Sequence, residues 1–190
     1  MSKDLAMSKL QKQSKELILV LGGARSGKSS YVQKQAEQIG RNVLYIATAK
    51  GDDPEMRDRI AAHKLSRPPF WITLEISRGI GNAVKKLAEK PSIIILDCLT
   101  ILIANLMTGD NNLEKELMDK VIIEIDSLLD VYSKRDIYLY IVSNEVGMGI
   151  VPVYYTGRLF RDVIGKANQY IAQKADKVIF LIAGIPVNLK

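Results

Sequence analysis

Short apolar runs recur along the chain and are separated by stretches that mix polar and apolar residues. Continuous apolar runs occupy residues 17–21, 43–47, 93–96, 137–142 and 178–182. Because these runs do not alternate with polar residues, they are typical of strands covered on both faces, as in a parallel sheet. Residues 71–76 alternate better and predict a further strand at an edge of the sheet.

The stretches between the runs predict helices, which we place at residues 29–39, 55–64, 113–131 and 157–175. Strands that alternate with helices predict an α/β, doubly wound fold, with a mostly parallel sheet and helices on both faces. Gly184, followed by residues 185–189, predicts a tight turn and a C-terminal antiparallel hairpin. The polar residues 1–16 predict a flexible N-terminal extension, and residues 17–190 show no second domain boundary.

The composition narrows the function classes. The chain has 190 residues and a formal net charge of +6, which suits an anionic ligand such as a nucleotide and supports nucleic-acid binding only weakly. The one cysteine, Cys98, excludes an intrachain disulfide, favours a reducing cytoplasm and is expected to be a small buried apolar residue. No apolar run approaches the roughly 20 residues that span a bilayer, so we expect no membrane insertion.

A phosphate-binding motif follows the first apolar run directly. Its form is GxxxxGK[ST], and its residues are Gly22, Gly23, Ala24, Arg25, Ser26, Gly27, Lys28 and Ser29. In such a loop the backbone N–H groups surround a polyphosphate, Lys28 reaches the β- and γ-phosphates, and the Ser29 hydroxyl ligates Mg²⁺. The alternative is a glycine-rich turn without a ligand. The predicted strand before the motif and helix after it favour the phosphate loop.

Asp97 ends the apolar run at residues 93–96. In phosphate-loop proteins, an aspartate at the end of such a strand holds Mg²⁺, directly or through water. The alternative is a carboxylate that caps the helix predicted to begin at Cys98. Beside the phosphate loop, the metal interpretation is the better one.

His63 is the only histidine and lies on a predicted helix rich in cations. Arg59 lies one turn before it, and Lys64 and Arg67 follow it. A neutral imidazole is a nucleophile, and the neighbouring cations would hold a phosphate group beside it. The alternative is a surface histidine on a charged helix, and spacing alone does not exclude it.

The segment after the apolar run at residues 137–142 has a mixed interpretation. Asn144 and Glu145 precede Gly147 and Gly149. Because ligands of open α/β sheets bind at the carboxyl ends of strands, this loop is expected to line the site, where it could meet a second substrate. The alternative is a structural turn that the two glycines permit.

Several segments together resemble one family, the bifunctional adenosylcobinamide kinase/adenosylcobinamide-phosphate guanylyltransferases (CobU/CobP family). The similarity extends from Leu17 to Lys190. The segments are GGARSGKS (22–29), YIATA (45–49), DPEMRDRIAAHKLSRPPFWITLE (53–75), ILDCLTILIANL (95–106), SNEVGMGIVP (143–152), GRLFRDVIGKANQYIAQKADKV (157–178) and GIPVNLK (184–190).

The resemblance implies a RecA-like phosphate-loop domain that forms homotrimers and uses Mg²⁺. It implies two activities. ATP or GTP phosphorylates adenosylcobinamide, and GTP then donates GMP to adenosylcobinamide phosphate through a GMP-histidine intermediate, which gives adenosylcobinamide-GDP for cobalamin biosynthesis. No nucleic-acid partner is implied.

The resemblance also implies roles for particular residues. The guanylylated histidine corresponds to His63, and Lys28 is the catalytic lysine of the phosphate loop. The further nucleotide contacts correspond to Ala47, Thr48, Ala49, Lys64, Leu65, Ser66, Arg67, Glu75 and Asp97. The metal ligands correspond to Ser29 and Asp97. One departure is Ala62, which stands where some relatives have a second histidine.

Two other functions stay open on the sequence. One is a small-molecule kinase that has the phosphate loop without histidine chemistry. The other is a RecA-like ATPase that acts on DNA or as a regulatory switch. Against the second, the chain is short and has no basic stripe interleaved with aromatic residues.

Overall fold

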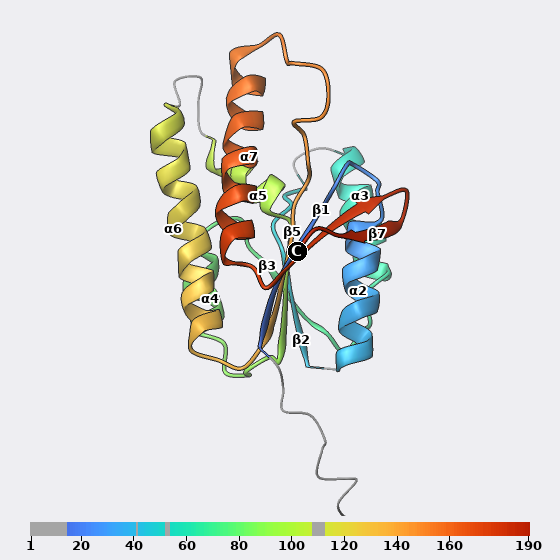
Figure 1. Ribbon diagram of the computed structural model, residues 1–190. Coiled ribbons are helices and arrows are strands. Elements are labelled where there is room, and N and C mark those ends of the chain that lie inside the picture. The colour runs from blue at the N-terminus through green and yellow to red at the C-terminus, as the bar shows by residue number, and fades with distance from the viewer. Residues whose placement is uncertain (1–14, 41, 52–53, 108–112) are drawn as a thin grey trace, which may run out of the picture.

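The computed structural model describes residues 15–40, 42–51, 54–107 and 113–190. In these residues, the strands form one seven-stranded sheet in the order β3-β2-β4-β5-β1-β6-β7 (Figure 1). The strands are β1 (Glu16–Gly22), β2 (Val43–Ala47), β3 (Ile72–Glu75), β4 (Ile93–Asp97), β5 (Tyr138–Val142), β6 (Lys177–Ile182) and β7 (Ile185–Asn188). Every pairing is parallel except that of β6 with β7. This arrangement confirms the predicted mostly parallel sheet and its antiparallel C-terminal hairpin.

Helices cover both faces of the sheet. They are α2 (Lys28–Ile39), α3 (Pro54–Leu65), α4 (Ile80–Lys85), α5 (Leu99–Leu106), α6 (Glu114–Ser133) and α7 (Tyr155–Lys174). In Figure 1, α4, α5, α6 and α7 lie on one side of the sheet, and α2 and α3 lie on the other. The parallel strands are therefore buried on both faces, as their continuous apolar runs predict.

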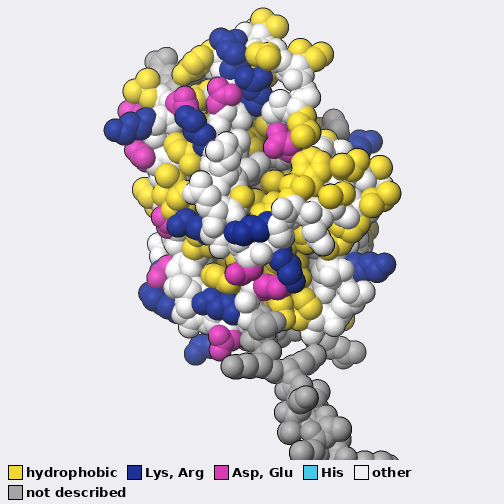
Figure 2. Space-filling model, in the orientation of Figure 1, with side chains coloured by type: hydrophobic (Ala, Val, Ile, Leu, Met, Phe, Trp, Pro, Cys, Tyr) yellow, Lys and Arg dark blue, Asp and Glu magenta, His cyan; other side chains and the backbone are white. Residues whose placement is uncertain are grey.

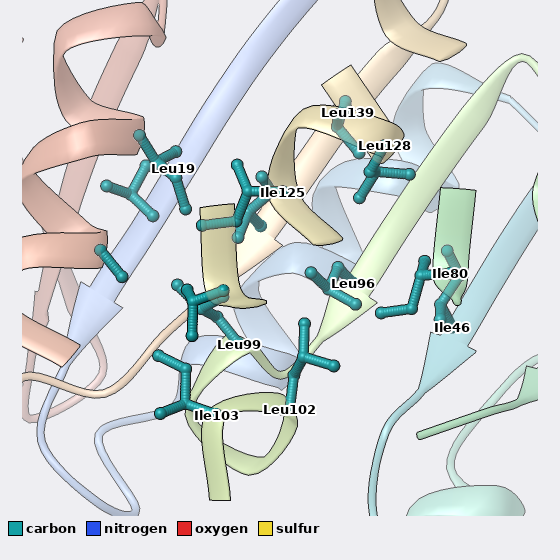
Figure 3. Close-up of a cluster of buried hydrophobic side chains, with 14 of the residues drawn as sticks. Leu19, Ile46, Ile80, Leu96, Leu99, Leu102, Ile103, Ile125, Leu128 and Leu139 are labelled. Atoms are coloured by element: carbon teal, nitrogen blue, oxygen red, sulfur yellow. The ribbon is translucent and has the colours of Figure 1, made fainter. Parts of the chain in front are cut away.

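Strand side chains divide between two hydrophobic clusters. In β1, Leu17 and Leu19 join the cluster under α4 to α7, whereas Ile18 and Val20 join the cluster under α2. Figure 3 shows the larger cluster, in which strand residues such as Leu19, Ile46 and Leu96 meet side chains of the covering helices. Each such side chain contributes roughly 1.5–3 kcal/mol when it is fully buried. Packing in the two clusters stabilises the sheet. The sheet in turn positions the loops at the carboxyl ends of its strands.

Most predicted elements are confirmed, with shifts at their ends. The strand predicted at residues 71–76 is β3, and it lies at the sheet edge as expected. The strand that begins with Glu16 shows that the first element starts inside the predicted extension, and residues 1–14 lie outside the described residues. The short helix α4 was not predicted. Among the described helices, none is long and apolar enough to cross a membrane.

Candidate active site

The phosphate loop connects β1 to α2, as predicted. Gly22 has φ 150° and Gly27 has φ 92°, values that L side chains rarely adopt. A Cβ at Gly22 would lie 2.6 Å from both the Leu181 carbonyl oxygen and the Ser26 hydroxyl. Gly27 precedes the first turn of α2, which has neither a side-chain cap nor an acidic residue. The positive end of α2 is thus left for an anion.

Two neighbouring segments hold the loop in place. The Gly184 N–H donates to the Ser26 carbonyl oxygen at 3.0 Å, so the turn of the C-terminal hairpin braces the loop. The Glu145 N–H donates to the Gly22 carbonyl oxygen at 3.0 Å, so the segment after β5 braces it from another strand. These bonds fix the loop backbone before any ligand arrives, which reduces the entropy cost of binding.

Lys28 is a buried cation at the base of the loop. Its side chain is 7% exposed, and its ammonium group donates to the Gly23 carbonyl oxygen at 2.6 Å. Burial lowers the pKa of Lys28, although the nearby Cys98 thiol and Asp97 carboxylate act in the opposite direction. A phosphate group would give this ammonium group the strong anionic partner that the loop carbonyl does not provide.

Asp97 lies at the end of β4, next to the end of β2, where it pairs in register with Ala47. The Tyr45 hydroxyl donates a hydrogen bond to its carboxylate. The N-cap position of α5 belongs to Cys98 and has no side-chain cap hydrogen bond, so the structure gives no support to Asp97 as the cap.

The donors of the site fit Mg²⁺. Asp97 and Ser29 line the same cavity as the phosphate loop and offer carboxylate and hydroxyl oxygens. Within the described residues, no group of three or more His, Cys, Asp or Glu side chains could hold a metal. Mg²⁺ bound to a nucleotide does not need such a cage, because phosphates and water supply its other ligands.

One cavity brings most of the predicted site residues together. Its volume is about 370 Å³, which lies within the size range of small-ligand pockets. His63 of α3 lines this cavity together with Lys28 and Asp97, although the three residues come from different parts of the chain. The other predicted residues that line this cavity are Ala24, Arg25, Ser26, Gly27, Ser29, Ala47, Ala49, Arg67 and Glu75.

The remaining predicted residues lie outside this cavity. Lys64 lines a second cavity of about 530 Å³ and forms a 2.5 Å ion pair with Glu75, which lines both cavities. Leu65 is 88% exposed. The Ser66 hydroxyl donates to the His63 carbonyl oxygen at 3.0 Å. Gly22, Gly23 and Thr48 do not line either cavity.

Thr48 has a structural position instead. It is fully buried, and its hydroxyl donates to the Cys98 carbonyl oxygen at 2.8 Å and accepts from the Cys98 N–H at 2.9 Å. These bonds tie the residue after β2 to the residue after β4. Thr48 therefore fixes the edge on which Asp97 lies.

Sequence reasoning missed several cavity residues. Asn144 lines the cavity, as expected of the loop after β5, but Tyr45, Ile60, Ile101 and Val142 were assigned no place in it. Cys98 was expected to be a small buried apolar residue, but it is only partly buried and lines the cavity. Tyr45 was concealed by its position inside an apolar run, where an aromatic residue usually indicates core packing.

The surroundings of the Arg67 side chain are those of a residue that binds an anion. Its guanidinium carbon lies 3.8 Å from the centre of the Tyr45 ring, a cation–π contact. Its Nε and Nη1 atoms are shielded from solvent and have no hydrogen-bond partner among the described residues. Shielded N–H groups without partners are costly, so an anion in the cavity would relieve that cost. The side chain of Arg59, the other cation expected near His63, lies outside the described residues.

Solved structures share the fold at low sequence identity. The chain is similar to the flagellar accessory protein FlaH from Methanocaldococcus jannaschii, with a TM-score of 0.52 and 17% identity over 93% of this chain and 79% of that one. It is also similar to the RadB recombinase, with a TM-score of 0.50 and 15% identity over 88% of this chain and 74% of that one. The fold is therefore the RecA-like phosphate-loop fold.

Curated relatives are similar over nearly the whole chain. One is the bifunctional adenosylcobalamin biosynthesis protein CobP of Pseudomonas aeruginosa, which is 38% identical over 90% of this chain and 96% of its own. Another is the CobU protein of Salmonella typhimurium, 38% identical over 92% of this chain and 99% of its own. The Escherichia coli CobU protein is 36% identical over the same shares.

A family model gives the same result. The model described as cobinamide kinase / cobinamide phosphate guanyltransferase matches residues 18–189, which include every strand from β2 to β7 and every residue of the cavity. The chain belongs to the cobinamide kinase / cobinamide phosphate guanyltransferase family.

Proposed function

We propose that this protein phosphorylates adenosylcobinamide with ATP or GTP and then transfers GMP from GTP to the product, giving adenosylcobinamide-GDP. Family membership supports both activities. The observation that carries the proposal is that Lys28, Asp97, His63 and Arg67 line a single cavity. Lys28 and Asp97 suit transfer of a γ-phosphoryl group, whereas His63 and Arg67 suit transfer of a nucleotidyl group.

The kinase reaction uses the phosphate loop. Lys28 and the backbone N–H groups around it hold the β- and γ-phosphates, while Ser29 and Asp97 hold the cation. Held there, Mg²⁺ would supply positive charge that stabilises the transferring phosphoryl group. The substrate hydroxyl attacks the γ-phosphorus, the bond from that phosphorus to the β-phosphate oxygen breaks, and the hydroxyl proton passes to solvent or to a base. Catalysis here consists of positioning and charge stabilisation rather than covalent chemistry.

The guanylyl reaction uses His63 as the nucleophile. A nitrogen of the neutral imidazole attacks the α-phosphorus of GTP, a P–N bond forms, and pyrophosphate leaves. The phosphate of the corrinoid then attacks the same phosphorus, the P–N bond breaks, and the imidazole is regenerated. The unpartnered N–H groups of Arg67 would hold phosphate oxygens during both steps.

Self-association is part of the proposal, with a homotrimer as the form that the family resemblance implies. Figure 2 shows apolar side chains gathered over the β6–β7 hairpin. Among them, Ile182, Ile185 and Leu189 are each more than half exposed. Apolar surface of this kind supports contact with another copy.

The single cysteine supports a reducing compartment such as the cytoplasm.

The proposal is tested by following both products. The purified protein is incubated with adenosylcobinamide, Mg²⁺ and either ATP or GTP, and the corrinoids are separated and weighed by mass spectrometry. We expect adenosylcobinamide phosphate with either nucleotide and adenosylcobinamide-GDP with GTP only. Phosphorylation without GMP transfer would leave a simple kinase, and the absence of both products would contradict the proposal.

A further inference from the structure

Tyr45 joins the two parts of the candidate site. It is an internal residue of β2 and is 1% exposed, yet part of it lines the cavity. Its hydroxyl donates to Oδ2 of Asp97, and its ring lies under the guanidinium group of Arg67. Neither the motif nor the family resemblance assigned a role to this residue.

The surroundings of Tyr45 fix its orientation. The Trp71 ring stacks on it with a centroid distance of 6.4 Å and an interplanar angle of 27°. The Tyr45 hydroxyl donates to the Asp97 carboxylate, which fixes the side chain from its other end. A buried donor with one carboxylate partner holds that carboxylate in one orientation.

We propose that Tyr45 is a positioning residue. Its hydroxyl orients the Asp97 carboxylate for Mg²⁺, and its ring holds the Arg67 guanidinium group in place. The inference rests on the proposed function. The tyrosine hydroxyl donates to Oδ2 of Asp97 and so restricts the orientation in which the carboxylate would hold a cation. The Tyr45 ring contacts the Arg67 guanidinium group and holds it beside the cavity. There its shielded N–H groups would bind a phosphate group. The hydroxyl thus acts on Asp97, and the ring acts on Arg67.

The fold provides a matched control in Tyr140. Tyr45 of β2 and Tyr140 of β5 both pair in register with Ile95 of β4, from opposite sides. The two tyrosines belong to the same hydrophobic cluster, and Tyr140 is 4% exposed. Tyr140 does not line the cavity. Replacing either tyrosine with phenylalanine removes one buried hydroxyl from the same layer of the core.

The experiment measures binding of the non-hydrolysable nucleotide α,β-methylene-GTP by calorimetry, first in EDTA and then with increasing Mg²⁺. In Tyr45→Phe the affinity in EDTA stays at the wild-type value, because the ring under Arg67 is retained. The Mg²⁺ concentration that gives half of the affinity gain rises about tenfold, the usual effect of losing a hydrogen bond to a metal-ligating carboxylate. Tyr140→Phe behaves as the wild type in both conditions.

A second background separates positioning from stability. In Asp97→Asn the Mg²⁺ response is already weakened, and adding Tyr45→Phe changes it no further. A general loss of stability would instead lower binding equally in both backgrounds. The proposal is overturned if Tyr45→Phe matches Tyr140→Phe, or if it weakens binding in EDTA as much as in Mg²⁺. If the wild type itself shows no Mg²⁺ response, the proposed function fails, and that result is distinct from either of these.

Discussion

The ammonium group of Lys64 lies 2.5 Å from the carboxylate of Glu75 and so ties the last turn of α3 to the end of β3. Lys64 directly follows His63, so this ion pair lies beside the proposed nucleophile. Both partners are about half exposed, with side-chain accessibilities of 48% and 52%. Solvent therefore screens the attraction, and the pair positions α3 more than it stabilises the fold.

We expect Glu75→Gln to lower the free energy of unfolding by less than about 1 kcal/mol, the usual limit for an exposed ion pair. The loss should shrink in high salt. Urea unfolding at low and high ionic strength, for Glu75→Gln, Lys64→Met and the double variant, gives the coupling energy of the pair. A loss of several kcal/mol that salt does not change would mean that the carboxylate has a buried structural role.

Lys28→Met should reduce phosphoryl transfer at least about a hundredfold, because it removes a cation that stabilises charge in the transition state. Stability should not fall, because burial of the wild-type ammonium group is costly in itself. Phosphorylation of adenosylcobinamide and thermal unfolding check the two parts. A folded variant with near-native turnover would remove Lys28 from the mechanism.

The same variant has a predictable pH dependence. Burial lowers the pKa of Lys28 in the folded state below its ordinary value of 10.5, so the unfolded chain binds more protons between these two pKa values. Wild-type stability therefore gains from this group as pH rises through that window. We expect the stability advantage of Lys28→Met to be largest below the folded-state pKa of Lys28 and to shrink as the pH rises toward 10.5. A constant advantage across that range would contradict this assignment.

Cys98 should react slowly with thiol reagents in the native protein. Burial, with a smaller contribution from the Asp97 charge, raises its pKa to about 12, so almost no thiolate is present at neutral pH. Because Cys98 is the only cysteine, a thiol titration reports on it alone. We expect slow reaction in the native state, further slowing with nucleotide and Mg²⁺, and fast reaction in denaturant. Equal rates with and without nucleotide would indicate that the ligand does not reach Cys98.

Gly81 permits the close packing of α4 against α6. It is buried, and a Cβ at this position would overlap the backbone of Ser127. Gly81→Ala should therefore destabilise the protein by about 1–3 kcal/mol, as overpacking does. Gly165 of α7 is the matched control, because its Cβ would meet no atom within 4 Å. Gly165→Ala should stabilise by up to about 1 kcal/mol in the same urea titration. Equal effects of the two substitutions would contradict the packing argument.

The sheet could be predicted from the sequence because its strands are continuous apolar runs. Leu17, Val43 and Ile93 all fall in such runs, and each lies in the core. Helix α4 could not be predicted, because it has only six residues and depends on contacts with α6. Its N-terminus is held by Glu124, which accepts hydrogen bonds from the Gly79 and Ile80 N–H groups. Such long-range capping leaves no local pattern in the sequence.

The candidate site could be predicted where it follows a motif. Lys28 is marked by the glycine-rich loop and Asp97 by the end of an apolar strand, and the structure brings the two residues into one cavity. Tyr45 could not be predicted, since its role depends on the pairing of β2 with β4, which places its hydroxyl beside Asp97. The packing of Arg67 on the Tyr45 ring likewise depends on the path of the chain after α3.

The central claim is that His63 is the nucleophile of a GMP transfer, and one measurement tests it directly. The protein is incubated with GTP and Mg²⁺ without a corrinoid and then examined by intact-mass and peptide mass spectrometry. We predict one GMP per chain, on His63, through a P–N bond that acid cleaves and base does not. His63→Ala should lose both the adduct and GMP transfer while retaining phosphorylation of adenosylcobinamide. An unmodified wild-type protein that still makes adenosylcobinamide-GDP, or an adduct on a lysine, would contradict the claim.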